Sequence, residues 1–152
     1  MVLELWEVLE NIDDAIETIL TNTEFAPEVR SIIIGDRTRV GDTKPPGIWV
    51  FTDDSLISHA GSSLSEEWTL SLLVAATYMH KDPETAKRNS IKLASQASAA
   101  LIKEGRTLAG NVRDLVRVAY QPGMPRIEGN NTIYGAGFEM EARFRFLEPN
   151  QS

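Results

Sequence analysis

The chain has 152 residues, no cysteine and a formal net charge of −7 at pH 7. This length suits one domain, or one domain with a long arm, and is enough to bury a core without covalent cross-links. The lack of cysteine excludes disulfides, thiolate metal sites and thiol nucleophiles. The negative charge favours solubility and argues against tight nonspecific DNA binding, which depends on neutralising phosphates.

The N-terminal segment Met1–Glu7 is acidic and amphipathic. A secretory signal would need a basic start and a continuous apolar stretch, and no run of about 18 apolar residues exists to span a membrane. We therefore expect a protein that is made and used in the cytoplasm, without a membrane anchor.

The first predicted element is an amphipathic helix over residues 2–22. Its apolar residues recur at helical spacing and form one stripe. Five carboxylates cover the other side: Glu7, Glu10, Asp13, Asp14 and Glu17. The β-rich run Val29–Ile34 then predicts the first strand.

A turn is predicted at Gly35-Asp36, with Arg37–Val40 as an extended arm. A loop containing Pro45-Pro46 is predicted from Gly41 to Gly47, because proline cannot donate to a strand ladder. A short strand follows at Ile48–Phe51. We predict a turn at Asp53-Asp54 and a further short extended piece at Leu56–His59.

A long strand is predicted at Glu66–Tyr78. Trp68, Leu70 and Leu72 fall on one face, and the other face becomes apolar towards the end of the strand. That change indicates a central strand that is covered on both sides for part of its length.

The second predicted helix begins at Pro83, after Asp82 as the N-cap, and ends before Gly105. Proline fits the first helical position because its missing N–H is not needed there. Alanine and serine fill many of the inward positions, which favours close packing on a sheet or another helix.

The last third predicts a strand at Val112–Tyr120, a loop at Pro122–Asn131 and a closing strand at Thr132–Leu147. In the closing strand Phe138, Met140, Ala142, Phe144 and Phe146 alternate with Glu139, Glu141, Arg143 and Arg145. Strict alternation is typical of a half-buried strand. Its outer surface carries opposite charges placed to pair with neighbours.

This order predicts an α+β fold: a mainly antiparallel sheet with two helices packed on one face and long loops or hairpin arms. Residues 1–152 are predicted to form a single domain. The loops 35–47 and 121–132 each run for about a dozen residues, longer than most connections. We expect both to be contact arms.

No set of residues predicts catalysis, a cofactor or a metal site. His59 and His80 lack a metal-binding spacing, and Asp13-Asp14 and Asp53-Asp54 are adjacent pairs that do not flank a cleft. The basic groups Arg37, Arg39 and Lys44, and Arg113, Arg117 and Arg126, are either scattered surface charge or contacts for an acidic neighbouring copy.

The order of several segments resembles a known family. The segments are Val29–Asp36, Pro46–Phe51, Trp68–Val74, the Asp82-Pro83 helix start, Thr107–Val112 and Phe138–Phe144. Over residues 3–147, this order is similar to that of the tail terminator (tail completion) proteins of long-tailed bacteriophages and related archaeal viruses.

The resemblance implies a structural virion protein of the tail or neck, not an enzyme, assembled in the host cytoplasm. It implies a hexameric ring that caps the tail tube, ends its polymerisation and joins the tail to the head connector or head completion protein. The tube protein would be a second partner. DNA would pass through the ring without specific binding, which an acidic bore would favour.

Interface aromatics and arginines tend to carry binding energy. We therefore predict subunit or partner contacts at Arg37, Arg39, Trp49, Arg126 and Tyr134. One alternative is another head–tail joining or neck protein. A second, of a different class, is a small ligand-binding or enzymatic α+β domain with a pocket under Trp68.

Overall fold

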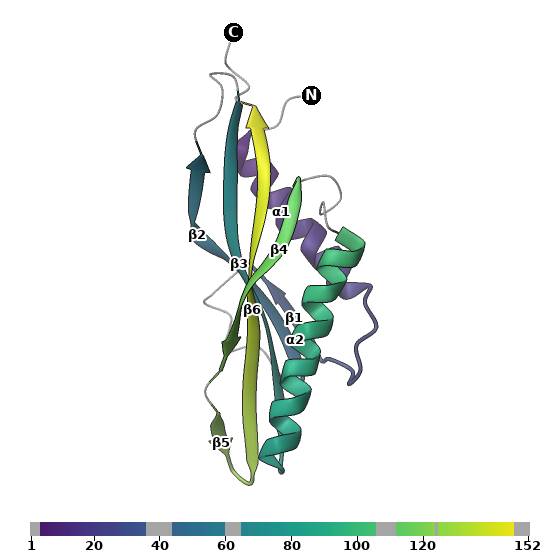
Figure 1. Ribbon diagram of the computed structural model, residues 1–152. Coiled ribbons are helices and arrows are strands. Elements are labelled where there is room, and N and C mark those ends of the chain that lie inside the picture. Colours follow the sequence, from purple (N-terminus) through teal and green to yellow (C-terminus); the bar gives the residue numbers. More distant parts are fainter. Residues whose placement is uncertain (1–3, 36–43, 60–64, 106–111, 124, 148–152) are drawn as a thin grey trace.

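The computed structural model describes residues 4–35, 44–59, 65–105, 112–123 and 125–147, with backbone alone for 53–59, 65–66, 104–105 and 146–147. The elements are α1 (Leu5–Thr21), β1 (Ser31–Ile34), β2 (Gly47–His59), β3 (Ser65–His80), α2 (Pro83–Gly105), β4 (Asp114–Pro122), β5 (Arg126–Glu128) and β6 (Asn131–Leu147). The predicted α+β fold is confirmed (Figure 1).

The six-stranded sheet has the order β1-β2-β3-β6-β4, and β5 also pairs with β6. Among the described strands, β1 and β2 run parallel and the other pairs are antiparallel. The centre is the pairing of β3 with β6, from Ser65 opposite Leu147 to His80 opposite Thr132. These two long strands give the described part of the molecule its elongated, twisted shape (Figure 1).

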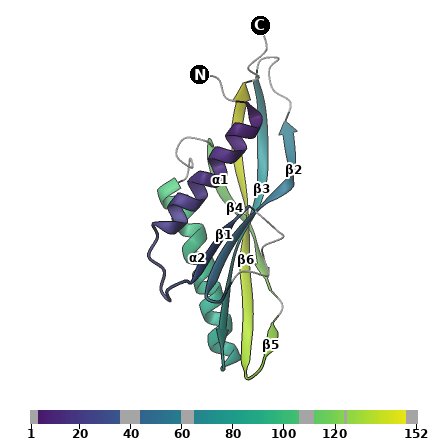
Figure 2. The same cartoon turned by 180° about the vertical axis from the view of Figure 1, so that it is seen from behind.

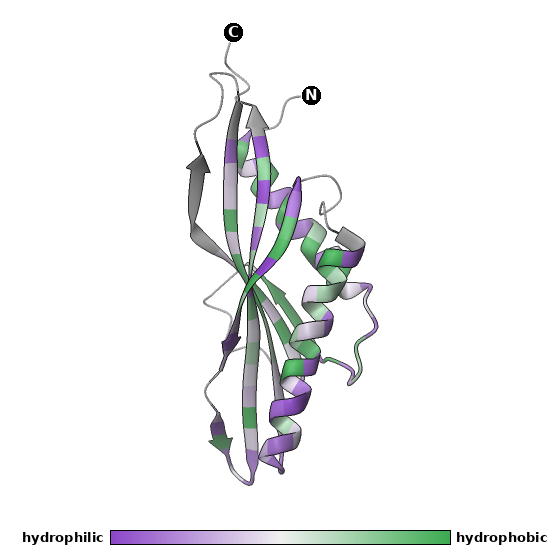
Figure 3. Cartoon of the chain, viewed as in Figure 1, coloured by the Kyte–Doolittle hydropathy of each residue, from purple (hydrophilic) through white to green (hydrophobic). Residues whose placement is uncertain are grey.

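Both helices lie on the same side of the sheet (Figures 1 and 2). The core lies between them and alternate residues of the strands, and its largest fully buried side chains include Ile12, Ile16, Ile48, Leu93, Leu101, Met140 and Phe144. The alternation of hydrophobic and hydrophilic residues along β6 is visible in Figure 3. We call the covered side the helix face and the other side the open face.

The helix starts follow the local sequence. At α1, a capping box links Glu4 and Glu7. At α2, the Asp82 carboxylate accepts hydrogen bonds from the Thr85 hydroxyl at 2.8 Å and the Glu84 amide at 3.4 Å. The Thr85 bond is the main reason why the pKa of Asp82 lies below its usual value. The predicted cap at Asp82 is therefore confirmed.

Two predictions for the strands were wrong. The predicted turn at Asp53-Asp54 does not exist, because β2 is one strand from Gly47 to His59. Its pairing with β3 shifts register between Thr52 and Leu56. An irregularity of this kind absorbs extra residues without ending a strand.

The predicted loop Pro122–Asn131 contains a strand, β5, paired with the start of β6. Glu128 lies opposite Asn131, so only Gly129 and Asn130 form the turn. Gly129 has φ +62°, a conformation that two-residue hairpin turns use and that glycine adopts freely. The connection is thus a hairpin arm for part of its length.

Candidate interaction surface

The open face carries a group of apolar side chains from three strands that the helices do not cover. Trp49 and Phe51 come from β2, Leu73 from β3 and Val118 from β4. The rings of Trp49 and Phe51 are in contact, with centroids 4.3 Å apart. We call these four residues the open-face patch. Val118 is 54% exposed.

Strand register explains why these residues gather. Phe51 lies opposite Leu73, and Leu73 lies opposite Glu139 on β6. Trp49 is two residues before Phe51 and therefore points to the same face. Val118 stands where the pairing of β4 with β6 shifts register between Arg117 and Ala119.

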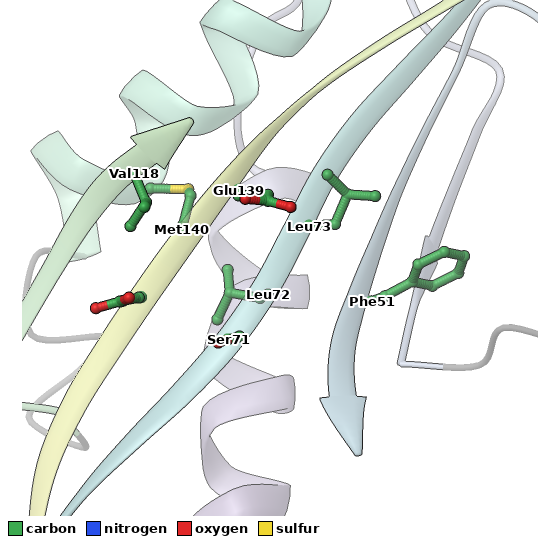
Figure 4. Close-up of a pocket in the computed structure, with 8 residues that line it drawn as sticks. Phe51, Ser71, Leu72, Leu73, Val118, Glu139 and Met140 are labelled. Carbon is green, nitrogen blue, oxygen red and sulfur yellow. The ribbon is translucent and has the colours of Figure 1, made fainter. Parts of the chain in front are cut away.

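A hollow of about 230 Å³ lies within this surface. Figure 4 shows its lining residues on four neighbouring strands, with Phe51, Leu73, Glu139 and Val118 among them and the helices behind the sheet. Sites for small molecules usually enclose about 300 to 1,000 Å³. The hollow is smaller than that and open, so it suits a protruding side chain of a partner protein better than a metabolite.

The charged residues of β6 lie on the same face and are largely paired within the chain. Glu139 accepts a hydrogen bond from Gln121 at 2.8 Å. Arg143 lies 3.4 Å from Glu141 and 3.8 Å from Asp114 of β4. The expectation that these charges pair with neighbouring strands is confirmed for Arg143. The open face therefore combines apolar side chains with partly exposed ion pairs.

The polar atoms of this face are not all satisfied. The indole N–H of Trp49 and the hydroxyl of Thr77 are buried and have no hydrogen-bond partner within the described structure. Buried polar atoms normally have partners, so each such atom costs free energy. Trp49 is thus held on this face by ring packing and not by a hydrogen bond.

Of the five predicted contact residues, the structure describes three, and these three lie apart from one another. Arg37 and Arg39 lie outside the described residues. Trp49 belongs to the open-face patch. Arg126 is exposed on β5, 3.9 Å from Glu128, and Tyr134 is half-buried opposite Tyr78, on the helix face.

The basic group predicted around the last hairpin is also divided. Arg117 is tied to α2: its Nε donates to the Ser98 hydroxyl at 2.9 Å, and its guanidinium lies 5.1 Å from the ring centre of Phe138. Arg113 forms an ion pair with Glu67 of β3. Arg117 is thus a structural residue that holds an edge strand to a helix.

The sequence prediction did not name Phe51, Leu73 or Val118 as contacts. The apolar end of the second face of β3 was a usable signal for Leu73. Nothing in the sequence marked Val118, because its exposure follows from the register shift in β4.

Metal and proton-transfer sites are not evident in the described residues. No group of three or more His, Asp or Glu residues there could hold a metal ion. His80 accepts a hydrogen bond from the Asp82 amide at 3.0 Å and so supports the start of α2. Trp68 is half-buried against the core and is not part of the hollow on the open face.

No protein-family model matches the chain, and no curated protein matches its sequence. Neither helix, over the residues described, is long and apolar enough to cross a membrane.

Proposed function

We propose that this chain is a structural protein of a viral tail, which forms a ring that caps the tail tube, ends its polymerisation and joins the tail to the head connector. The order of sequence segments, which resembles that of tail terminators, suggested this function. The open-face patch is the single observation that carries it.

The patch supports a protein–protein contact for a physical reason. Trp49, Phe51, Leu73 and Val118 line a sheet face on which neither helix packs, although each is an apolar residue that gains free energy when it leaves water. A tail protein that docks on this face would cover the patch. Aromatic residues at the centre of such contacts usually contribute most of the binding energy.

The same subunit design suits a ring. A head-to-tail interface between unlike surfaces closes into a ring when the rotation between copies is right. Six copies with a net charge of −7 each would give a strongly acidic assembly. Such a ring would repel the phosphates of DNA and let it pass without binding.

The test combines ring formation with tube capping. The purified chain is mixed with tubes assembled from the tail tube protein of the same genome and viewed by electron microscopy. We expect rings at the tube ends and shorter tubes when the chain is present during polymerisation. Unchanged tube lengths together with bare tube ends would contradict the proposal.

A matched pair of variants tests the role of the patch. Leu73→Asp places a charge in the patch and should abolish capping while the circular dichroism spectrum stays native. Met79→Asp is the control, because Met79 is exposed, on the same strand and the same face, but six residues away from Leu73. Equal capping by both variants would remove the patch from the mechanism.

Another neck or head–tail joining protein would share this architecture and differ in its neighbour. Binding to the tube protein alone separates the two functions. A terminator binds tubes without any head protein, whereas a joining protein requires the head connector.

A further inference from the structure

The outer side of α1 is acidic and carries one exposed aromatic residue. Helix α1 contains five carboxylates and no basic residue. Glu10, Asp14 and Glu17 are exposed and follow at the spacing of neighbouring helical turns, so they form one stripe. Trp6, one turn before Glu10, continues the stripe and is 60% exposed. We call these three carboxylates the acidic stripe.

The acidic stripe has no cation beside it in the described structure. None of its carboxylates takes part in an ion pair or hydrogen bond there. The uncompensated negative charge affects the neighbouring residue Asp13. Burial, with the nearby charges of Asp14 and Glu10, raises its pKa to about 6. Like charges are thus crowded on α1 without compensation.

The outer side of α2 is basic, although the whole chain is acidic. Arg88, Lys92 and Lys103 are exposed and lie within a narrow angular range of the helix, with the small exposed Ala99 between the last two. We call these three residues the basic stripe. Their side chains also lack an ion-pair partner among the described residues. The acidic residue on this side, Glu84, lies in the first turn, where its negative charge interacts favourably with the positive end of the helix dipole.

Within one subunit the starts of the two helices lie far apart (Figures 1 and 2), whereas their last turns meet, and Lys103 lines a hollow there together with Thr18 and Ile19 of α1. Helix α1 covers the half of the sheet nearest the chain termini, and α2 covers the half that ends at the β5–β6 hairpin (Figures 1 and 2). The stretch from Trp6 to Glu17 is about 17 Å long and that from Arg88 to Lys103 about 22 Å, at 1.5 Å per residue. One stripe can therefore cover the other when two copies meet.

We propose that α1 of one copy docks on α2 of a second copy, with Trp6 and the acidic stripe against the basic stripe. This inference rests on the proposed ring and names the contact that closes it. The two surfaces are different, so the contact is head-to-tail and repeats around an axis. Trp6 supplies the aromatic anchor, and its indole face can receive Arg88 or Lys92 as a cation–π partner.

A second copy fits these observations better than other partners do. A nucleic acid would meet the basic stripe, but it would also meet a chain with a net charge of −7. A basic protein would satisfy α1 and leave α2 unpaired. Another copy of the same chain neutralises both stripes at once.

The test reverses each stripe and then combines the two variants. Glu10→Lys/Glu17→Lys gives both stripes a net positive charge, and Arg88→Glu/Lys92→Glu gives both a net negative charge. Each variant alone should associate about tenfold or more weakly than the wild type in low salt, because like charges now face each other. An equimolar mixture should recover association, since each variant offers the surface that the other needs. Sedimentation velocity and native mass spectrometry measure these states.

Two further measurements keep the test independent of misfolding. Glu28→Lys/Glu128→Lys carries the same charge change on exposed residues outside both helices and should associate like the wild type. Trp6→Ala should weaken association and remove the change in tryptophan fluorescence that accompanies it. Circular dichroism confirms that each variant is folded.

The outcomes separate this inference from the proposed function. If each reversed variant assembles like the wild type, or if the mixture stays dissociated, the α1–α2 contact is wrong while ring formation stands. If the stripe variants bind nucleic acid or tube protein differently but assemble normally, the stripes serve that partner instead. A wild type that remains a monomer in low salt, with and without tubes, overturns both proposals.

Discussion

The two faces of the sheet come from the same strands and differ in what they contact. On β3, Leu72 points to the helix face and is only 3% exposed, whereas its neighbour Leu73 points to the open face and is half-buried. Both are leucines, and sequence alone assigns them the same hydrophobic value. The difference shows that the partner of a face, and not its composition, decides whether an apolar residue stabilises the fold or remains available for docking.

The largest loss of stability should come from removing a buried side chain on the helix face. Leu72→Ala removes a fully packed side chain and leaves a cavity, which should lower the free energy of unfolding by about 3 kcal/mol. Leu73→Ala removes the same atoms from a half-exposed site and should cost about 1 kcal/mol. Urea unfolding of both variants measures the difference. Equal losses would mean that the two faces are equally packed.

The open face also contains one closely packed position. An added Cβ at Gly137 would lie 3.1 Å from a methyl carbon of Leu73, 3.2 Å from the Ala75 Cβ and 3.2 Å from the Val74 carbonyl oxygen. Gly137→Ala should therefore destabilise the fold by about 1 to 2 kcal/mol through overpacking. Thermal unfolding of this variant measures the loss of stability. Leu73→Ala in the same chain should recover part of the loss, because it removes one of the crowded neighbours.

The edge of the helix face depends on Arg117. This side chain joins β4 to α2 through the Ser98 hydroxyl and the Ser95 carbonyl oxygen. Arg117→Ala should lower the free energy of unfolding by about 1 to 2 kcal/mol, since it leaves hydrogen-bonding groups without partners. Arg145→Ala, also at an exposed strand position but without such bonds to the described residues, should change the free energy of unfolding by less than about 0.5 kcal/mol. Denaturant unfolding of the two variants decides between a structural and a surface role for Arg117.

Much of this fold could be predicted from sequence because local patterns agreed with tertiary packing. The Asp82-Pro83 start of α2 and the alternation in β6 each follow from a few adjacent residues. The parallel pairing of β1 with β2, the strand β5 and the register shift at Val118 could not be predicted, since they depend on contacts between distant segments. The positions of the predicted contact residues that the structure describes depend on such contacts too. Trp49 and Tyr134 both looked like interface aromatics, and only the strand register places them on opposite faces.

The smallest predicted effect concerns Asp13, at the edge of the helix face. Its Oδ1 is buried and has no hydrogen-bond partner among the described residues, and its Oδ2 lies close to Gly35 just after β1. Because its pKa is raised from 3.8 to about 6, the folded state binds more protons than the unfolded state between these values. This carboxyl therefore lowers stability as pH rises from about 4 to 6, and the loss persists at pH 7.

Asp13→Asn removes the titrating charge and should raise the free energy of unfolding by about 1 kcal/mol at pH 7, a value reduced for partial solvent exposure. Below about pH 4 the gain should vanish, because the wild-type carboxyl is then protonated in both states. Thermal unfolding from pH 3.5 to 7.5 measures both limits, with Glu28→Gln as a control at an exposed residue outside the acidic stripe. If α1 docks on a neighbouring α2, the nearby cations should lower the pKa of Asp13 in the assembly. The gain at pH 7 should then be smaller at protein concentrations where the chain associates, and a gain that does not depend on concentration would argue that no cation comes near α1.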